Sequence, residues 1–313
     1  MTSEFEFPMV GEAPDLDLSV AVVGCGSIGQ RHIRSLLKMG PRVVGVDPRD
    51  VKMPDAVKRV RTLREAGQAD AVLVCTPASE RIGTIRKALS MGAHLFVEKP
   101  LALTYEAAQK VSALVAEYPQ RVVMMGYNLR FDPDLQTFAA SLPDLGPLIG
   151  VEVRCSSWLP DWRAGRDYRE TPSAKSSLGG GILREASHEL DLVNWLFGFA
   201  ARVEATMART SSFEIDVEDT VDALIDTHSG VPVGLHLDFC TPGYERTVRV
   251  FAQGTSAEWH LLPGSPMYER EMAHFLDCVV NGRRPAATVA DGLRAMALDA
   301  MIREAARSER KAA

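Results

Sequence analysis

The sequence predicts an α/β protein with two domains, in which a parallel, doubly wound sheet precedes a mostly antiparallel one. Two observations lead to this prediction. The chain has 313 residues, more than one ordinary core needs, because domains usually contain roughly 100 to 200 residues. Beyond residue 128, short apolar segments between helical stretches give way to longer segments with an alternating pattern. We therefore expect domains at residues 1–127 and 128–313.

Short strands and helical stretches alternate through the first domain. An apolar helical stripe follows the first strand, where Ile28, His32 and Leu36 lie four residues apart, and it ends at Gly40. Segments rich in β-branched residues recur between Gly, Pro or Asp, at Ser19–Val23, Val43–Val46, Ala71–Cys75, His94–Val97 and Val122–Met125. This alternation is typical of a doubly wound parallel sheet.

The second domain contains longer segments of alternating polar and apolar residues, which predict an antiparallel sheet. These segments lie at Gly150–Ser157, Arg202–Arg209, Thr220–Thr227, Val231–Phe239 and Arg246–Ala252. A helix is expected at Leu183–Phe197, because apolar residues share one face and Gly198 follows as a stop. Further helices are expected near Pro266–Asn281 and Val289–Arg307.

The composition disfavours several classes of protein. Hydrophobic residues make up 46% and charged residues 24%, and no apolar run approaches the roughly 20 residues of a membrane helix. A net charge of -6 disfavours a general nucleic-acid binder, which needs a basic face for phosphates. The five cysteines lie far apart, without the spacing of a zinc site or a disulfide framework. We expect a cytoplasmic protein with no membrane or nucleic-acid partner and a flexible acidic tail at residues 1–17.

A glycine-rich loop joins the first strand to the first helix. Gly24-Cys25-Gly26-Ser27-Ile28-Gly29 fits the pattern G-x-G-x-x-G. The first glycine permits a tight turn, the second lets the backbone approach a pyrophosphate, and the third lets helix and strand pack closely. The helix N-terminus offers free N–H groups and a partial positive charge to the phosphates. Alone the pattern marks only a turn, but between a strand and a helix it predicts a Rossmann dinucleotide site.

Asp47 follows the second strand, close to the spacing of about 20 residues expected of a carboxylate that binds ribose hydroxyls. Such a carboxylate repels a 2′-phosphate, which favours NAD over NADP. Arg49 works against this preference, because its guanidinium could pair with that phosphate, so NADP stays open. The alternative for Asp47 is an ordinary turn before Pro48. The stretch from Asp47 to Asp70 is short for both a full helix and a third strand, so we expect an abbreviated crossover.

Glu98-Lys99-Pro100 stands at the end of the fourth strand, where a doubly wound sheet presents residues to its ligand. On its own, this tripeptide fits a surface turn equally well. Other motifs occur in order along the chain: Cys75-Thr76-Pro77, Gly126-Tyr127-Asn128-Leu129-Arg130-Phe131 and Gly179-Gly180-Gly181. With the glycine loop and Asp47, this series resembles the Gfo/Idh/MocA oxidoreductase family, named for glucose–fructose oxidoreductase and inositol dehydrogenase. The resemblance extends from Val20 to the C-terminal helices.

The resemblance implies a Rossmann domain paired with an open-faced, mostly antiparallel α/β domain. It also implies chemistry with NAD or NADP on sugars, inositols or sugar nucleotides. Lys99 is then the catalytic lysine, and the cofactor residues also include Cys75, Thr76, Pro77, Glu98 and Asn128. An amine suits the role of Lys99, because an alcohol gives up a hydride only as its hydroxyl proton is removed, and burial can lower the pKa of a lysine. Arginine would stay charged.

The helix after the glycine run carries Glu185 and His188 three residues apart, so both lie on one face. The resemblance implies that this pair assists Lys99 in binding the substrate hydroxyl and moving its proton, although many relatives carry Asp at the position of Glu185. An ordinary imidazole pKa near 6.5 suits His188 to a proton relay. The longer Glu185 could move the carboxylate by about 1 Å. A metal site lacks a second half here, so we expect no metal, and a core histidine is the other alternative.

A segment dense in Trp, Tyr and Arg precedes the glycine run. Aromatic faces pack against sugar rings, and arginines bind carboxylates or phosphates. We therefore expect a substrate-binding loop that includes Trp162, Arg163 and Tyr168, with Arg130 of the Asn128 motif as a further substrate residue. A solvated loop or a contact between subunits is the alternative.

The sequence thus predicts an NAD(P)-dependent dehydrogenase or reductase that acts on a sugar, cyclic polyol or sugar nucleotide, with Lys99 and His188 as the proton relay. Two alternatives stay open. One is a redox-neutral lyase, hydrolase or epimerase with tightly bound NAD, and the other is a non-catalytic sensor on the same fold. An exposed face of the second sheet would need covering, so we also expect a homodimer or homotetramer.

Overall fold

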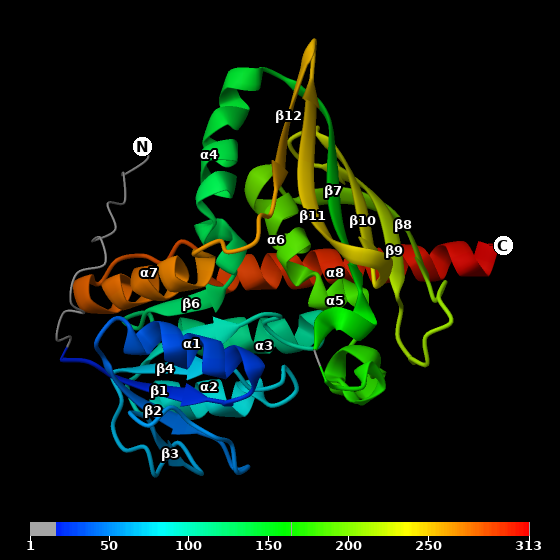
Figure 1. Ribbon diagram of the computed structural model, residues 1–313. Coiled ribbons are helices and arrows are strands. Elements are labelled where there is room, and N and C mark those ends of the chain that lie inside the picture. The colour runs from blue at the N-terminus through cyan, green and yellow to red at the C-terminus, as the bar shows by residue number, and fades with distance from the viewer. Residues whose placement is uncertain (1–16, 164, 313) are drawn as a thin grey trace. The chain divides into compact units, whose positions relative to one another are not determined.

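The computed structural model describes residues 17–163 and 165–312. Its contacts divide the chain into two compact units. The first contains the described residues up to Glu98, together with Val111–Phe131 and Pro266–Val289. The second contains the described residues of Lys99–Lys110 and Asp132–Ser265, and those from Ala290 onward. Each unit is built around one sheet (Figure 1).

The first unit contains a six-stranded sheet with the order β3-β2-β1-β4-β5-β6, and every neighbouring pair is parallel. Its strands are β1 (Ser19–Val23), β2 (Arg42–Val46), β3 (Lys58–Val60), β4 (Ala71–Val74), β5 (His94–Glu98) and β6 (Val123–Gly126). The strand order reverses between β1 and β4. Ligands of such sheets bind beyond the carboxyl ends of the strands at this point. The predicted doubly wound sheet is confirmed.

Helices connect these strands and bury their apolar faces on the sheet. α1 (Ser27–Leu37) follows the glycine loop and contributes Ile33 and Leu36 to the core. α2 (Arg81–Ser90) precedes β5, and α3 (Tyr105–Ala116), whose last residues belong to this unit, precedes β6. α7 (Met267–Asn281) packs against α1, and Phe275 of α7 contacts Phe96 of β5 with ring centroids 5.6 Å apart. A late segment of the chain thus completes the core of the first unit.

The crossover after β2 is abbreviated, as the sequence predicts. Between β2 and β4 every residue is described, and the only regular element there is the short strand β3. Pro48 and Pro54 lie in this stretch, and proline lacks the N–H that a helix interior or a ladder requires. The part of the fold that follows Asp47 is therefore built mainly from turns.

The second unit contains another six-stranded sheet, with the order β12-β11-β7-β10-β9-β8 (Figure 1). Its strands are β7 (Leu148–Trp158), β8 (Ala200–Ala208), β9 (Thr220–Thr227), β10 (Pro232–Asp238), β11 (Cys240–Ala252) and β12 (Thr255–His260). All pairs are antiparallel except β7 with β10, so the expected mostly antiparallel sheet is confirmed. Buried and exposed residues alternate along β9, which shows that one face is covered and the other exposed.

Helices cover one part of this second sheet. α5 (Ile182–Glu185) packs on β9 and β10, α6 (Ser187–Leu196) on β7, and α4 (Pro133–Ser141) on β12. α8 (Val289–Ala312) ends the described chain. The sequence predicts one helix at Leu183–Phe197, but the structure has a break at Ala186, with φ -88° and ψ 28°. Among the described residues, no helix is long and apolar enough to cross a membrane.

Candidate active site

The glycine loop has the backbone that its sequence predicts. Gly24 has a φ of +91°, and a Cβ there would lie 2.8 Å from the backbone of Cys75. A Cβ at Gly29 would lie 2.0 Å from the carbonyl oxygen of Gly24, so helix and loop meet without room for a side chain. A Cβ at Gly26 would meet nothing within 4 Å. Two glycines therefore serve close packing, whereas Gly26 leaves open space at the start of α1.

Asp47 lies just beyond the end of β2 and is 1% exposed. Its carboxylate accepts hydrogen bonds from the backbone N–H of Cys25 at 2.9 Å and from the Arg49 guanidinium at 2.9 and 3.0 Å. Burial raises the pKa of Asp47, but the hydrogen bonds from Arg49 and Cys25 outweigh it, and the pKa is lowered. The carboxylate expected to bind ribose is thus ionised, with Arg49 folded onto it.

Two buried side-chain oxygens near the strand ends have no partner. Among the described residues, Thr76 Oγ1 and Asn128 Oδ1 are buried without a hydrogen bond. Thr76 follows β4 and Asn128 follows β6, so both stand where this type of sheet binds its ligand. Buried polar atoms normally have a partner, and the amide of a nicotinamide ring is one that both could share. These atoms and the open glycine loop fit a dinucleotide.

Glu98 ends β5, and its carboxylate lies 2.5 Å from Nε2 of the buried His32. The sequence placed His32 in an apolar helical stripe, and its contact with Glu98 had no sequence signal. Cys75 also lies close to Glu98, and burial first, then this carboxylate, raises the pKa of the Cys75 thiol well above 9.0. Cys75 is therefore a neutral thiol rather than a reactive thiolate.

Lys99 and Glu185 form a pair within the second unit. Lys99 Nζ donates to the backbone carbonyl of Glu185 at 2.9 Å and to its carboxylate at 3.4 Å. The helix break at Ala186 explains the first bond, because the N–H of Glu189 bonds to Ala186 rather than to the carbonyl of Glu185. Ser173 Oγ donates to the other carboxylate oxygen at 2.6 Å. Burial raises the pKa of Glu185, but Lys99 and Ser173 outweigh it and lower the pKa, so the carboxylate is ionised.

His188 is the second residue of the next helix, α6, and is 9% exposed. Burial, then the charges of Lys99 and Arg246, hold its pKa well below 6.5. The expectation of an ordinary pKa for His188 is therefore wrong, because burial and two cations disfavour the imidazolium. The imidazole ring is neutral at physiological pH, and it can both accept and donate a hydrogen bond.

A buried ion pair that the sequence did not indicate lies beside His188. Arg246 Nε of β11 contacts the Glu189 carboxylate at 2.6 Å, and Glu189 is fully buried. Breaking such a pair would leave one buried charge without compensation. The pair therefore holds α6, and with it His188, on the second sheet.

The side chains expected to form a substrate-binding loop, Trp162, Arg163 and Tyr168, contact different parts of the second unit. Arg163 lies close enough to Glu185 to lower its pKa, which brings this arginine to the Lys99 pair. Trp162 instead packs edge-on against Phe239, with ring centroids 4.9 Å apart. The Tyr168 hydroxyl accepts a hydrogen bond from the backbone of the segment before β9 at 3.2 Å. Among the three expected loop residues, Arg163 is thus the one whose charge acts on Glu185.

The other expected site residues lie in the first unit. Ser27 and Ile28 begin α1, and Pro77 directly follows Thr76. Arg130 is buried, and its guanidinium donates to the carbonyl of Ala286 at 2.7 Å. Within the described part of the chain, no group of three or more His, Cys, Asp or Glu side chains could hold a metal ion.

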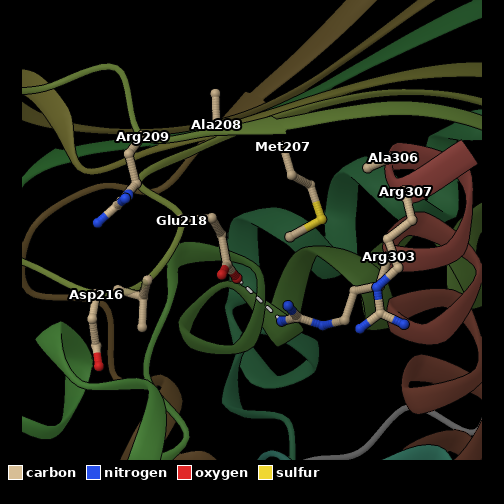
Figure 2. Close-up of a pocket in the computed structure, with 9 residues that line it drawn as sticks. Met207, Ala208, Arg209, Asp216, Glu218, Arg303, Ala306 and Arg307 are labelled. Atoms are coloured by element: carbon tan, nitrogen blue, oxygen red, sulfur yellow. Dashed lines mark hydrogen bonds and ion pairs between the residues drawn. The ribbon is translucent and has the colours of Figure 1, made fainter. Parts of the chain in front are cut away.

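A pocket of about 330 Å³ lies next to the glycine run of the second unit. Its lining includes Met207, Arg209, Asp216, Glu218, Arg303 and Arg307. Figure 2 shows the Glu218 carboxylate directed toward Arg303, with which it forms an ion pair of 3.1 Å. A Cβ at Gly181 would lie 2.4 Å from this carboxylate. The Glu218 carboxylate therefore leaves no room for a side chain at Gly181, which directly precedes α5 and lies four residues before Glu185.

Known proteins share this architecture. An inositol 2-dehydrogenase of Burkholderia cenocepacia (strain HI2424) is 26% identical over 331 residues, which cover 92% of this chain and 94% of that protein. The crystal structure of a myo-inositol 2-dehydrogenase from Lactobacillus plantarum matches with a TM-score of 0.83 and 16% identity, over 94% of this chain and 98% of that one. The WlbA dehydrogenase of Bordetella pertussis, solved with NADH and UDP-GlcNAcA, matches with a TM-score of 0.79 and 20% identity, over 94% and 97%. The two structural likenesses show the fold.

Two family models match consecutive parts of the chain. Residues 18–127 match the model of the GFO/IDH/MocA oxidoreductase family, which describes an NAD-binding Rossmann fold. Residues 143–258 match the C-terminal domain of the same family. Together the matches cover more than two thirds of the chain, and their order agrees with the parallel sheet followed by the mixed sheet. The chain belongs to the GFO/IDH/MocA family of oxidoreductases, with NAD as its cofactor.

Proposed function

We propose that the chain is an NAD-dependent dehydrogenase or reductase that moves a hydride between the nicotinamide and a hydroxyl or carbonyl carbon of a cyclic polyol, sugar or sugar nucleotide. The observation that carries this proposal is the pairing of Lys99 with Glu185, because Lys99 directly follows the last residue of β5, a strand of the NAD-binding sheet. Relatives named inositol 2-dehydrogenase and a likeness to a dehydrogenase bound to UDP-GlcNAcA support this substrate class.

The chain's own residues divide the work as follows. The pyrophosphate is bound by Gly24, Gly26, Gly29 and the first residues of α1. The adenosine ribose is bound by Asp47 and Arg49. The nicotinamide end is bound by Cys75, Thr76, Pro77, Glu98 and Asn128. NAD, when bound, supplies the hydride acceptor. In this proposal the reacting hydroxyl binds Lys99 Nζ and His188, and the substrate is also contacted by Arg163, Trp162, Tyr168 and Arg130.

Proton transfer falls to Lys99. In the oxidative direction Lys99 Nζ accepts the hydroxyl proton as the hydride leaves the carbon, and in the reductive direction Nζ returns it. The ionised Glu185 orients Nζ and stabilises the ammonium that forms. His188 is neutral, so it hydrogen-bonds the hydroxyl without repelling the charge that develops on Lys99.

Replacement of Lys99 tests this assignment. Lys99→Ala should lower turnover by a factor of about 10² to 10⁴, the usual contribution of a positioned acid or base. NADH binding, followed by quenching of protein fluorescence, should persist because the glycine loop and Asp47 are intact. The exposed Lys110→Ala is the matched control and should retain full activity. Wild-type turnover in Lys99→Ala would rule out the proposed role.

A screen of substrates tests the class. Polyols, sugars and sugar nucleotides should be offered with NAD, and their carbonyl forms with NADH, while absorbance at the NADH band is followed. We expect at least one cyclic polyol, sugar or sugar nucleotide to give stoichiometric hydride transfer. Substrate consumption with no net change in NADH would instead identify a redox-neutral reaction.

A further inference from the structure

A buried arginine ties together the ends of two neighbouring strands in the first unit. Arg81 is the first residue of α2 and is 5% exposed. Its Nε donates to the carbonyl of Thr76 at 2.9 Å, and its Nη1 donates to the carbonyl of Glu98. Thr76 follows β4 and Glu98 ends β5, and these two strands are hydrogen-bonded neighbours. One planar guanidinium therefore fixes the backbone at two adjacent positions where the sheet meets its ligand.

A second contact fixes Glu98 from the phosphate-binding side. His32 of α1 is fully buried, and its Nε2 lies 2.5 Å from the Glu98 carboxylate. The ring is enclosed edge-on by Phe96, at 5.1 Å between centroids, and by Tyr268 of α7, at 6.2 Å. The helix that begins at the glycine loop is therefore connected, through His32 and Glu98, to the backbone that Arg81 holds.

The charges of this cluster are consistent with a fixed geometry. Burial lowers the pKa of Arg81 to about 10, although the Glu98 carboxylate opposes the shift, so Arg81 is a cation at neutral pH. Glu271 of α7 also lies near Glu98, and burial first, then repulsion by Glu98, raises its pKa well above 4.5. Glu271 therefore holds its proton more strongly than an ordinary glutamic acid does. A buried cation is costly unless it is hydrogen-bonded and close to a negative charge. Arg81 donates to two backbone carbonyls, and the charge of Glu98 stabilises its cationic form.

We propose that Arg81 is a positioning residue for the nicotinamide end of the cofactor, because it sets the positions of Thr76 and Glu98 relative to one another. The inference rests on the proposed roles of these two residues in binding the nicotinamide. Thr76 Oγ1 is buried and lacks a protein partner. Its ability to hydrogen-bond a ligand therefore depends on the position of the Thr76 backbone. Arg81 bonds that backbone directly, whereas its connection to the phosphate loop is indirect, through Glu98 and His32.

A comparison of two ligands tests this proposal without measuring turnover. NADH and ADP-ribose share the adenosine and pyrophosphate, but only NADH carries the nicotinamide ring. Their dissociation constants should be measured by calorimetry for the wild-type chain and for Arg81→Met and Arg81→Lys. We expect Arg81→Met to bind NADH about tenfold or more weakly while ADP-ribose changes by less than about threefold, because hydrogen bonds from a charged group are lost only at the nicotinamide end. The emission shift of bound NADH should decrease in parallel. Arg86→Met, an exposed arginine on the same helix, is the matched control and should behave as wild type.

The outcomes separate this inference from the proposed function. Equal weakening of both ligands in Arg81→Met, or no weakening of either, would overturn the positioning role. If Arg81→Met does not fold, Arg81→Lys decides, because lysine keeps the charge but cannot bond both carbonyls with one planar group. A lysine variant with wild-type affinities and emission would overturn the inference. A wild-type chain that does not distinguish NADH from ADP-ribose, and leaves the NADH emission unchanged, would overturn the proposed roles of Thr76 and Glu98 themselves.

Discussion

At the scale of single residues, Ser173 is the neighbour of the Lys99 pair that can be tested most directly. Its hydroxyl donates to Glu185 at 2.6 Å, and both this bond and Lys99 hold the carboxylate in its ionised form against burial. Ser173→Ala should lower kcat by roughly tenfold and move the acid limb of the pH profile to higher pH, because loss of a hydrogen bond to a charged group raises the pKa of Glu185. NADH affinity should not change. Ser173→Thr should restore the profile, and an unshifted acid limb in Ser173→Ala would contradict the argument.

His188 gives a pH dependence of stability with a definite sign. Its pKa in the folded chain lies well below 6.5, so below pH of about 6.5 the unfolded chain binds a proton that the folded chain does not. Stability should therefore decline as the pH falls from about 7 to about 5, and His188→Gln should decline less over the same interval. Thermal unfolding of both proteins across this range measures the difference. Parallel curves would contradict a buried, neutral His188.

The residues that sequence reasoning found and missed differ in a physical way. Lys99 and Glu185 belong to separate motifs, and the structure brings them within hydrogen-bond distance although they lie 86 positions apart. Asp47 follows β2, as its spacing predicts. Ser173 and Arg81 were missed because each acts through a contact that depends on the folded path of the chain, and neither carries a motif of its own. The lowered pKa of His188 likewise depends on burial, which a histidine in a sequence does not reveal.

At the scale of elements, Gly181 and the start of α5 lead to a second kind of prediction. Gly181 has φ +108° and ψ 148°, a region that is essentially restricted to glycine. A Cβ there would also lie 2.4 Å from the Glu218 carboxylate, which is paired with Arg303. Gly181→Ala should therefore cost more than the roughly 1 to 3 kcal/mol of backbone strain alone, and should lower turnover by displacing Glu185.

Gly254→Ala provides the matched control for this element. Gly254 also has a positive φ, +79°, but a Cβ there would meet nothing within 4 Å. Denaturant unfolding of both variants separates the strain of a positive φ from the contact with Glu218, and kcat separates local displacement of α5 from a general loss of stability. Equal losses of stability with normal turnover in Gly181→Ala would show that Glu218 does not constrain α5.

The elements themselves were predicted unevenly. The buried strands of the first sheet were found within a residue or two, because short β-branched runs between glycines and prolines leave little alternative. The break at Ala186 was missed, since the apolar face of residues 183–197 continues through it. At the break the Glu185 carbonyl, which a continuous helix would bond internally, accepts from Lys99 instead, a tertiary contact without a local sequence signal. β12 was also missed, because it is an edge strand with mostly exposed residues and therefore lacks a clear apolar pattern.

At the scale of the whole molecule, the order of sheets was predictable but the path of the chain was not. Alternation with helices indicates a parallel sheet, and longer alternating segments indicate an antiparallel one. That α7 returns to pack on α1, far earlier in the chain, has no signature in a single sequence, because any apolar helix face could bury itself against several partners. The contacts within the structure assign residues 266–289 to the first unit. A single domain boundary after residue 127 stays a prediction.

The exposed face of the second sheet leads to the last prediction, which concerns assembly. This face forms a groove of about 610 Å³, and Leu224 within it is 65% exposed. The surrounding side chains carry both signs, including Glu152, Arg154, Asp222, Arg249 and Glu258, so the face can complement a second copy of itself. We expect a homodimer or homotetramer by light scattering, and Leu224→Lys should shift it toward monomer by placing a charge in the interface. Val280→Lys, which changes another exposed apolar residue, on α7, should leave the assembly unchanged. A wild-type chain of monomer mass would contradict the use of this face.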